Sequence, residues 1–303
     1  MGIGGLVGPR NTDDLYDGEI TAGCVDQSRL KSVTTSPFRS KRRFEHYPDE
    51  PANRLASRSV MLTTSRARFL ASHSARHRTV IKVLELIKKR PDLELEAFRS
   101  HWLEVHGPIV AQIPGIVRYT QSHPLLGGYR KGPLAFDGVA EIWVEDKDTL
   151  RGFAELESFA AAKSDEPNFI DVSSLVEIVT DEHVIVDNPE PSGGIKNIAF
   201  MQFRPELAPT EAFGYWRSEH GPVAASIPGL VRYVQSHVRA GAFLNGRRPS
   251  IEGVAVAWFE SVDVMRQAAT SAAYAATRAD EANFLLPTRP GSILTHQHVL
   301  LGD

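Results

Sequence analysis

From about Val80 onward, apolar residues recur with the spacing of a strand in some segments and with the spacing of a helix in others. The same order of segments occurs twice along the chain, in two cycles. The segment VIKVLELIKK opens the first cycle and NIAFMQFR opens the second. Both are alternating or rich in β-branched residues, which is typical of strands. Apolar residues at helical spacing follow, and Pro114-Gly115 ends that helix. These helical positions in the first cycle are Phe98, Trp102, Val105, Ile109 and Ile113.

The rest of each cycle predicts two strands, a helix and a last strand. In the first cycle, IVRYTQSH and DGVAEIWV are the strands, and a Gly/Pro-rich loop joins them. The helix carries Leu150, Phe153, Leu156 and Phe159 on one side, and SLVEIVTDEHVIV supplies the last strand. The order strand, helix, strand, strand, helix, strand is that of the ferredoxin-like unit, so the predicted fold class is α+β.

The two cycles are also repeats in sequence. FRSHWLEVHGPIVAQIPGIVRYTQSH occupies residues 98–123, and AFGYWRSEHGPVAASIPGLVRYVQSH occupies residues 212–237. We therefore predict domains at 79–189 and 190–303, joined by the linker NPEPSGG. Because helices cover only one face of such a sheet, the other face needs a partner. The second repeat can supply it, which predicts an α/β barrel closed within one chain: a monomeric pseudo-dimer that can associate further.

Residues 1–78 differ from the repeats, since they mix Gly, Ser, Thr, Asp and Arg without a sustained period. We interpret them as a disordered or loosely packed leader. From Met61 onward the leader is basic and rich in serine, as in an organelle transit peptide; the alternative is a basic tail. The expected location is cytoplasmic, or mitochondrial if translation starts at Met61.

Composition narrows the classes of function. The formal net charge is −3, so nothing indicates a nucleic-acid partner, and no apolar run approaches the length of a membrane helix. The single cysteine, Cys24, can form no intrachain disulfide, which suits a reducing compartment. No Cys/His cluster has zinc spacing and no phosphate-loop pattern occurs. We expect no metal and no cofactor; the expected partner is a small-molecule substrate.

The repeated motif contains the candidate site. His106 follows Trp102 by four residues, so both lie on the helix face turned toward the sheet. Pro108 has no amide hydrogen and should loosen the helix beside His106. A buried histidine in this place can serve catalysis, or it can simply hold the helix on the sheet.

Strand alternation adds polar groups to this candidate site. Tyr119, Gln121 and His123 share one face of their strand, and Asp137 and Glu141 share one face of the next. We expect all five to face the barrel interior, where they either bind a ligand or satisfy each other. The predicted catalytic residues are His106, Tyr119, His123 and Glu141, and the predicted substrate-binding residues are Gln121, Asp137, Trp102, His220, Tyr233, Gln235, His237 and Glu252.

The two copies differ at one titratable position of this set. Asp137 becomes Glu252, which keeps a carboxyl group, but Glu141 becomes Val256, which cannot transfer a proton. If Glu141 acts in catalysis, only the first repeat holds a complete site. If both repeats are active, the chemistry must depend on His and Tyr.

The segments FRSHWLEVHGPIV, IPGIVRYTQSH, DGVAEIWV and DEPNF, with their second copies, resemble the EthD domain of the dimeric α/β-barrel superfamily. The resemblance implies ferredoxin-like subunits that pair into a barrel, and it covers roughly residues 79–303. In the related methylmuconolactone methylisomerases a helix His and a strand Tyr line the pocket. These map onto His106 and Tyr119, and onto His220 and Tyr233. Fungal polyketide relatives are described as dehydratases or decarboxylases.

Three classes of function stay open. The first is a cofactor-independent lyase or isomerase acting on a small aromatic, polyketide or lactone-like molecule. His106 would then transfer the proton, Tyr119 and His123 would stabilise a developing enolate or phenolate, and Glu141 would act as base or orient another group. The second is a barrel oxygenase. The third is a binding protein without catalytic activity that carries a metabolite in a degradative or biosynthetic pathway.

Overall fold

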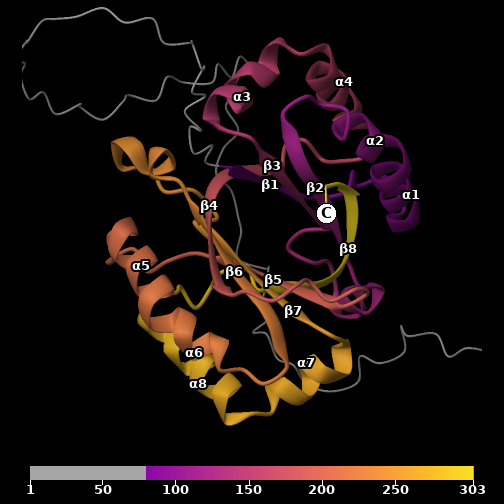
Figure 1. Ribbon diagram of the computed structural model, residues 1–303. Coiled ribbons are helices and arrows are strands. Elements are labelled where there is room, and N and C mark those ends of the chain that lie inside the picture. The colour runs from indigo at the N-terminus through magenta and orange to yellow at the C-terminus, as the bar shows by residue number, and fades with distance from the viewer. Residues whose placement is uncertain (1–79, 303) are drawn as a thin grey trace, which may run out of the picture.

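Each repeat builds a four-stranded antiparallel sheet with helices on one face (Figure 1). The computed structural model describes residues 80–302. The first repeat contains β1 (Ile81–Ile87), α1 (Leu95–Ser100), a π-helix (His101–His106), α2 (Gly107–Val110), β2 (Ile116–Pro124), β3 (Gly138–Val144), α3 (Lys147–Gly152), α4 (Glu157–Asp165) and β4 (Val176–Val186). The second contains β5 (Ile195–Met201), α5 (Pro209–Tyr215), a π-helix (Trp216–His220), α6 (Gly221–Ala225), β6 (Leu230–Val238), β7 (Gly253–Phe259), α7 (Val262–Ala269), α8 (Ala272–Asp280) and β8 (Ser292–Leu301).

The two sheets join edge to edge into one closed barrel. Within the repeats the strand orders are β4-β1-β3-β2 and β8-β5-β7-β6, as in a ferredoxin-like fold. At the two seams β2 pairs with β8, and β4 pairs with β6. No edge strand of either sheet stays unpaired among the described residues, which removes a usual site of aggregation. The predicted α+β barrel is confirmed.

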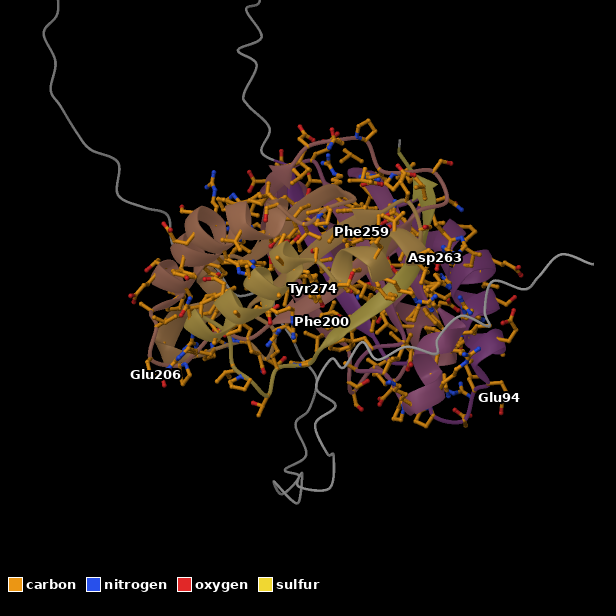
Figure 2. The ribbon with its side chains drawn as sticks, turned by 90° about the horizontal axis from the view of Figure 1, so that it is seen from below. Glu94, Phe200, Glu206, Phe259, Asp263 and Tyr274 are labelled. Atoms are coloured by element: carbon orange, nitrogen blue, oxygen red, sulfur yellow. The ribbon has the colours of Figure 1, made fainter. Side chains whose placement is uncertain are left out.

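The helices lie outside the barrel. Those of the first repeat cover one side, and α5 to α8 cover the opposite side (Figure 1). Figure 2, turned by 90°, shows Glu94 and Glu206 on opposite flanks; each lies shortly before the first helix of its repeat. The division at 189 and 190 stays a prediction, and it falls between β4 and β5.

Strand alternation separates two kinds of core. One face of each strand packs under the helices, where Ala140 and Ile142 meet Phe98 and Trp102. The other face fills the barrel interior with apolar side chains, including Leu84, Leu86, Val139, Ile198, Phe200, Val254 and Val256. The barrel is therefore a packed core along much of its length and not an open channel.

The first predicted helix is continuous, but its middle is a π-helix over His101–His106. Pro108 cannot donate a backbone hydrogen bond, and the amide of Gly107 bonds instead to the carbonyl of Trp102, five residues back. The wider turn changes which side chains face the sheet. Val105, which we assigned to the apolar face, is 46% exposed, whereas Trp102 and His106 are buried. The expected loosening beside His106 is confirmed.

The second predicted helix is two helices in the structure. Residues Phe153–Glu155 form a 3-10 turn, and Leu156 is extended with φ −92° and ψ 130° before α4 begins. Leu150, Phe153, Leu156 and Phe159 nevertheless all pack on one core. Their helical spacing correctly indicated that they share one buried face, but it did not reveal the break between the two helices.

The predicted leader, residues 1–78, lies outside the described residues. Within residues 80–302 no helix is long and apolar enough to cross a membrane.

We expect the first repeat alone to lose its monomeric state. In a fragment of residues 79–189, the outer edge of β2 and the C-terminal half of β4 have no pairing strand, because their partners in the full chain are β8 and β6. Size-exclusion chromatography with light scattering should show homodimers or aggregates. A stable monomeric fragment would contradict the dependence of one sheet on the other.

Gly138 tests the contact between β3 and the π-helix. A Cβ atom there would overlap the Trp102 indole, which is fully buried. Gly138→Ala should lower the free energy of unfolding by about 1–3 kcal/mol, as overpacked cores do. Gly152→Ala is the control, since a Cβ atom there meets nothing within 4 Å. Urea titrations of the two variants should differ; equal stabilities would show that the indole moves aside.

Candidate active site

A polar network fixes the π-helix of the first repeat to β2. The Gln121 Nε2 donates to the Trp102 carbonyl at 2.8 Å and to the Tyr119 hydroxyl at 2.7 Å. The His123 Nε2 lies 3.0 Å from the Gln121 Oε1, and its ring stacks on the Trp102 indole at 4.4 Å. All four side chains are buried. The Trp102 carbonyl therefore accepts both from Gly107 and from Gln121, which stabilises the irregular turn.

The second repeat reproduces this network. The Gln235 Nε2 donates to the Trp216 carbonyl at 2.8 Å and to the Tyr233 hydroxyl at 3.1 Å. The His237 ring stacks on the Trp216 indole at 4.6 Å, and its Nε2 lies 3.0 Å from the Gln235 Oε1. Two copies with the same contacts indicate a structural device of the fold.

The predicted convergence of five polar groups on the barrel interior is wrong. Tyr119, Gln121 and His123 face the helices, because they belong to the face of β2 that packs on Trp102. The Ser122 hydroxyl, on the opposite face of β2, lies 3.5 Å from the Glu141 carboxyl instead. Glu141 does lie inside the barrel, so the sheet separates it from His106 and its helix.

Glu141 belongs to a buried ion cluster between the repeats. Its Oε1 lies 2.6 Å from the Lys82 Nζ, and its Oε2 contacts the Lys196 Nζ. Lys82 and Lys196 occupy equivalent positions in β1 and β5, and all three side chains are 1% exposed. Lys82 also contacts Glu182 at 2.7 Å. Burial, together with the charges of Lys82 and Arg118, lowers the pKa of Lys196 well below its usual range.

The carboxylates of Asp137 and Glu252 form hydrogen bonds that hold backbone segments together at one end of the barrel. The Asp137 carboxylate accepts from the Lys89 amide at 3.0 Å and from the Tyr129 hydroxyl at 3.1 Å. The Glu252 carboxylate accepts from the Phe203 amide at 2.7 Å. Both tie the segment after the first strand of their repeat to the start of the third strand.

His106 forms a dyad with Asp165, at the end of α4. The His106 Nδ1 lies 3.0 Å from the Asp165 Oδ2, and the His101 Nε2 lies 3.0 Å from the Oδ1. Burial alone would raise the pKa of Asp165, but hydrogen bonds from Asn168, His101 and His106 hold it below its usual value. Burial lowers the pKa of His106, although Glu85 and Asp165 oppose this effect. At neutral pH the imidazole is therefore uncharged.

The second repeat contains an equivalent dyad. The His220 Nδ1 lies 2.7 Å from the Asp280 Oδ2, and the Tyr215 hydroxyl donates to the Oδ1 at 2.6 Å. Burial also lowers the pKa of His220. The dyad alone does not distinguish the repeats.

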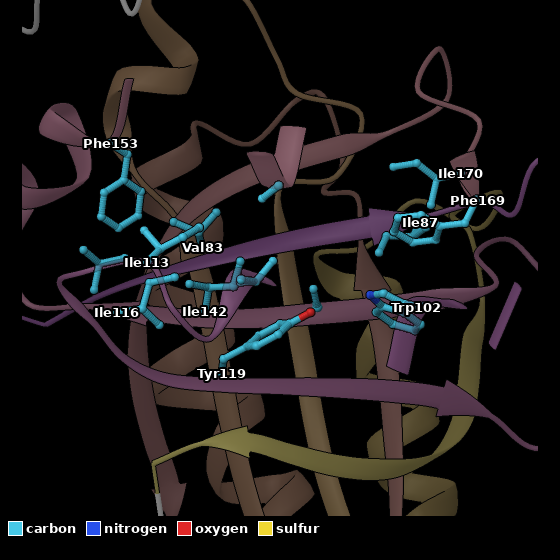
Figure 3. Packing of buried hydrophobic residues seen from close by; sticks show 14 of the residues in the cluster. Val83, Ile87, Trp102, Ile113, Ile116, Tyr119, Ile142, Phe153, Phe169 and Ile170 are labelled. Atoms are coloured by element: carbon cyan, nitrogen blue, oxygen red, sulfur yellow. The ribbon is translucent and has the colours of Figure 1, made fainter. Parts of the chain in front are cut away.

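A pocket beside His106 lies between the sheet and the helices of the first repeat. Its apolar lining gathers at the end of the core away from Trp102 and Phe169 (Figure 3). The polar lining residues are His106, Glu85, Lys163, Glu166 and Glu177, and the apolar ones are Val83, Val110, Ile113, Ile116, Ile142, Leu150, Phe153, Phe159 and Ala162. Of the residues predicted from the sequence, only His106 lines this pocket. Trp102, Tyr119, Gln121 and His123 support it from the neighbouring core.

Lys163 lies among three carboxyl groups at this pocket. Its Nζ is 3.1 Å from Glu85, 2.6 Å from Glu166 and 3.4 Å from Glu177. Burial and the charge of Glu85 raise the pKa of Glu166 to about 7, although Lys163 opposes the rise. The pocket thus holds a neutral histidine and a carboxyl group that can carry a proton at neutral pH. That combination can move protons.

Sequence reasoning did not name these acidic partners as site residues. Asp165 and Asp280 were visible in the repeated segments DEPNF and DEANF, so their recurrence in both copies was an available signal. Glu85 and Glu177 carry no such signal, because the second repeat has Ala199 and Ser292 at the equivalent positions. Among residues 80–302, no group of three or more His, Cys, Asp or Glu side chains is arranged to hold a metal ion.

The model of the EthD domain matches residues 90–173 and 204–288, which together make up more than half of the chain. The chain belongs to the EthD family. Each match covers most of one repeat, so the tandem of EthD domains expected from the sequence is confirmed. No curated protein matches the chain.

Solved structures are similar to this chain at low sequence identity. An anthrone oxidase-like protein is 12% identical, with a TM-score of 0.50 over 74% of this chain and 94% of its own. An ethyl tert-butyl ether D (EthD) family protein from Bacillus halodurans c-125 is 21% identical, with a TM-score of 0.30 over 34% of this chain and 99% of its own. A mutant chlorite dismutase from Candidatus Nitrospira defluvii is 12% identical, with a TM-score of 0.44 over 74% and 93%. At these identities the similarity concerns the fold alone.

We expect acid to destabilise the barrel through its buried histidines. Burial, then the neighbouring His298 and His183, lowers the pKa values of His123 and His237 to about 3. Below the ordinary value of 6.5 the unfolded chain therefore binds protons that the folded chain cannot bind. Stability is complete above that pH and falls as the pH drops toward 3, by up to about 1.4 kcal/mol per pH unit and histidine.

The measurement is the free energy of unfolding in urea at pH 7 and pH 5. The double variant His123→Gln/His237→Gln should lose less stability between these two values than the unaltered chain, because glutamine does not titrate. An equal loss in both proteins would show that other groups cause the acid sensitivity.

Proposed function

We propose that the chain is a proton-transfer enzyme, a lyase or isomerase, and that the pocket of the first repeat is its active site. The observation that carries this proposal is the His106–Asp165 dyad at the wall of a mainly apolar pocket. A neutral histidine held by a carboxylate is a common general base. The bound molecule would be small and aromatic, since aliphatic and phenyl side chains dominate the lining.

The proposal gives each ring nitrogen of His106 its own role. The Nδ1 donates its hydrogen to the Asp165 carboxylate, which leaves the lone pair on Nε2. No described residue forms a hydrogen bond with Nε2. In the proposed reaction this nitrogen takes a proton from a carbon next to a carbonyl group of the substrate. Asp165 orients the ring and stabilises the imidazolium that forms.

Glu166 is the proposed proton donor. A carboxyl group with a pKa of about 7 is partly protonated at neutral pH and can protonate a developing enolate or a leaving oxygen. Lys163, at 2.6 Å, stabilises the carboxylate that remains. Tyr119, Gln121 and His123 position the helix that carries His106, and in this proposal they do not contact the substrate.

The first repeat is proposed as the active one, but not because Glu141 is present only there. The exchange of Glu141 for Val256 lies inside the barrel and leaves the helix-side pocket unchanged. The difference that bears on the pocket is its lining. Phe153, Glu85 and Glu177 are replaced in the second repeat by Ala268, Ala199 and Ser292.

Deuterium incorporation tests the proposal without knowledge of the natural substrate. A panel of bicyclic aromatic ketones and lactones is incubated with the protein in deuterated water. Mass spectrometry then measures the exchange of the hydrogen next to the carbonyl. His106→Asn should slow catalysed exchange by about 10²–10⁴-fold, the usual contribution of a general base.

His220→Asn is the matched control, because it breaks the equivalent dyad of the second repeat. It should leave the exchange rate within about threefold while lowering stability by about 1–3 kcal/mol. Equal loss of exchange in both variants would contradict a single active repeat. Binding of panel members without any exchange would favour a binding protein instead of an enzyme.

A further inference from the structure

Two imidazole rings share the Asp165 carboxylate in the first repeat. The His101 Nε2 lies 3.0 Å from the Asp165 Oδ1 and 3.1 Å from its Oδ2, and the His106 Nδ1 lies 3.0 Å from the Oδ2. In an α-helix of about 3.6 residues per turn, residues five apart point in different directions. The wider π-turn brings both rings to one carboxylate. The Phe169 ring packs on both, with centroids 5.1 Å from His101 and 4.7 Å from His106.

The two rings differ in their access to solvent. An ionised carboxylate only accepts hydrogen bonds, so the His101 Nε2 and the His106 Nδ1 both donate to Asp165. The His101 side chain is 27% exposed, and no described residue forms a hydrogen bond with its Nδ1, so this nitrogen can take up a proton from solvent. The His106 side chain is only 5% exposed, so placing a charge on it costs more free energy. Of the charged groups in residues 80–302, Asp165 alone lies within hydrogen-bond distance of His101.

The second repeat holds its carboxylate with a group that does not titrate near neutral pH. Tyr215 occupies the position of His101, and its hydroxyl donates to the Asp280 Oδ1 at 2.6 Å. That hydrogen bond raises the pKa of the Tyr215 hydroxyl, which therefore stays an uncharged donor. The remaining donor is the same in both copies, since Asn168 and Asn283 each donate to their carboxylate at 2.9 Å. The repeats thus differ in whether the exposed partner of the carboxylate can become charged.

We propose that His101 regulates the proton-transfer site of the first repeat. This inference rests on the proposed function, since it concerns the pH dependence of the same site. As the pH falls below neutral, His101 takes up a proton before His106 and forms an ion pair with Asp165. The carboxylate charge that would stabilise a charged His106 is then neutralised, so His106 stays uncharged and remains a base at lower pH. In this proposal His101 does not contact the substrate and acts only through Asp165.

The other charged groups near His106 form a constant background. Burial lowers the pKa of His106, Glu85 from β1 opposes this effect, and Lys163 from α4 adds to it. Glu85 and Lys163 contact each other at 3.1 Å. Lys163 also contacts Glu166, which follows α4, and Glu177 on β4. None of these groups is altered in the variants described next.

A nuclear magnetic resonance titration of the full chain tests the proposal without a substrate. Proton–nitrogen spectra of the imidazole rings report the protonation of each histidine between pH 8 and pH 5, and the His106 signals are those missing in His106→Asn. His101→Tyr copies the second repeat, and His101→Gln supplies a second donor that cannot be charged. Both variants should raise the pH at which His106 is half protonated by about 0.5–1 pH unit, because a neighbouring positive charge is removed. If one variant does not fold, the other decides.

The reciprocal exchange in the second repeat is the matched control. Tyr215→His places a ring that can be charged beside Asp280, and it should lower the pH at which His220 is half protonated by a similar amount. The pH profile of deuterium exchange gives a second measurement. In His101→Tyr the fall of the exchange rate on the acid side should move to higher pH, in step with the titration of His106.

Two results would overturn the inference: a pH of half protonation of His106 that is unchanged or lower in the variants, or a His106 ring that stays neutral throughout the titration in every protein. The proposed function is tested separately by the His106→Asn exchange experiment. If His106 titrates as expected but exchange does not depend on it, the coupling to His101 is right and the proposed catalysis is wrong. If exchange depends on His106 but its titration does not shift, His101 is only a structural partner of Asp165 and the proposed regulation is wrong.

Discussion

Pairing of sheet edges is the constraint on which the rest of the structure depends. A four-stranded ferredoxin-like sheet has two open edges and one uncovered face, and neither is tolerated well in water. Here β8 covers β2 and β6 covers β4, so one closure removes the open edges and buries the uncovered faces. The helices are then confined to the outside. A pocket for a ligand forms between helices and sheet, because side chains fill the barrel itself.

The same closure explains why the polar residues predicted for the site divide into two groups. Residues on alternate positions of one strand face different compartments, and the two compartments do not communicate through the sheet. Gln121 and His123 contact the π-helix on the outer face of the sheet, whereas Glu141 contacts lysines inside the barrel. The positioning network and the ion cluster therefore lie on opposite sides of the sheet, although Ser122, the residue after Gln121, contacts Glu141.

Much of the fold could be predicted from the sequence, and less of the candidate site. The strand and helix periods and the internal repeat were sufficient to predict the barrel. His106 was found because a motif repeated it, and Pro108 correctly indicated an irregular helix. The facing of Tyr119 was missed because alternation tells which residues share a face, not which face is inside. Lys163 and Glu85 come from a helix and a strand 78 residues apart, and no local pattern joins them.

One carboxylate shared by two lysines makes the two halves of the barrel unequal partners. Lys82 and Lys196 are equivalent, but only the first repeat contributes Glu141 between them. A barrel of two second repeats would bury two lysines around two valines, and an uncompensated buried charge is strongly destabilising. A barrel of two first repeats would keep a carboxylate for each lysine. The second half therefore depends on the first for the carboxylate that contacts its Lys196.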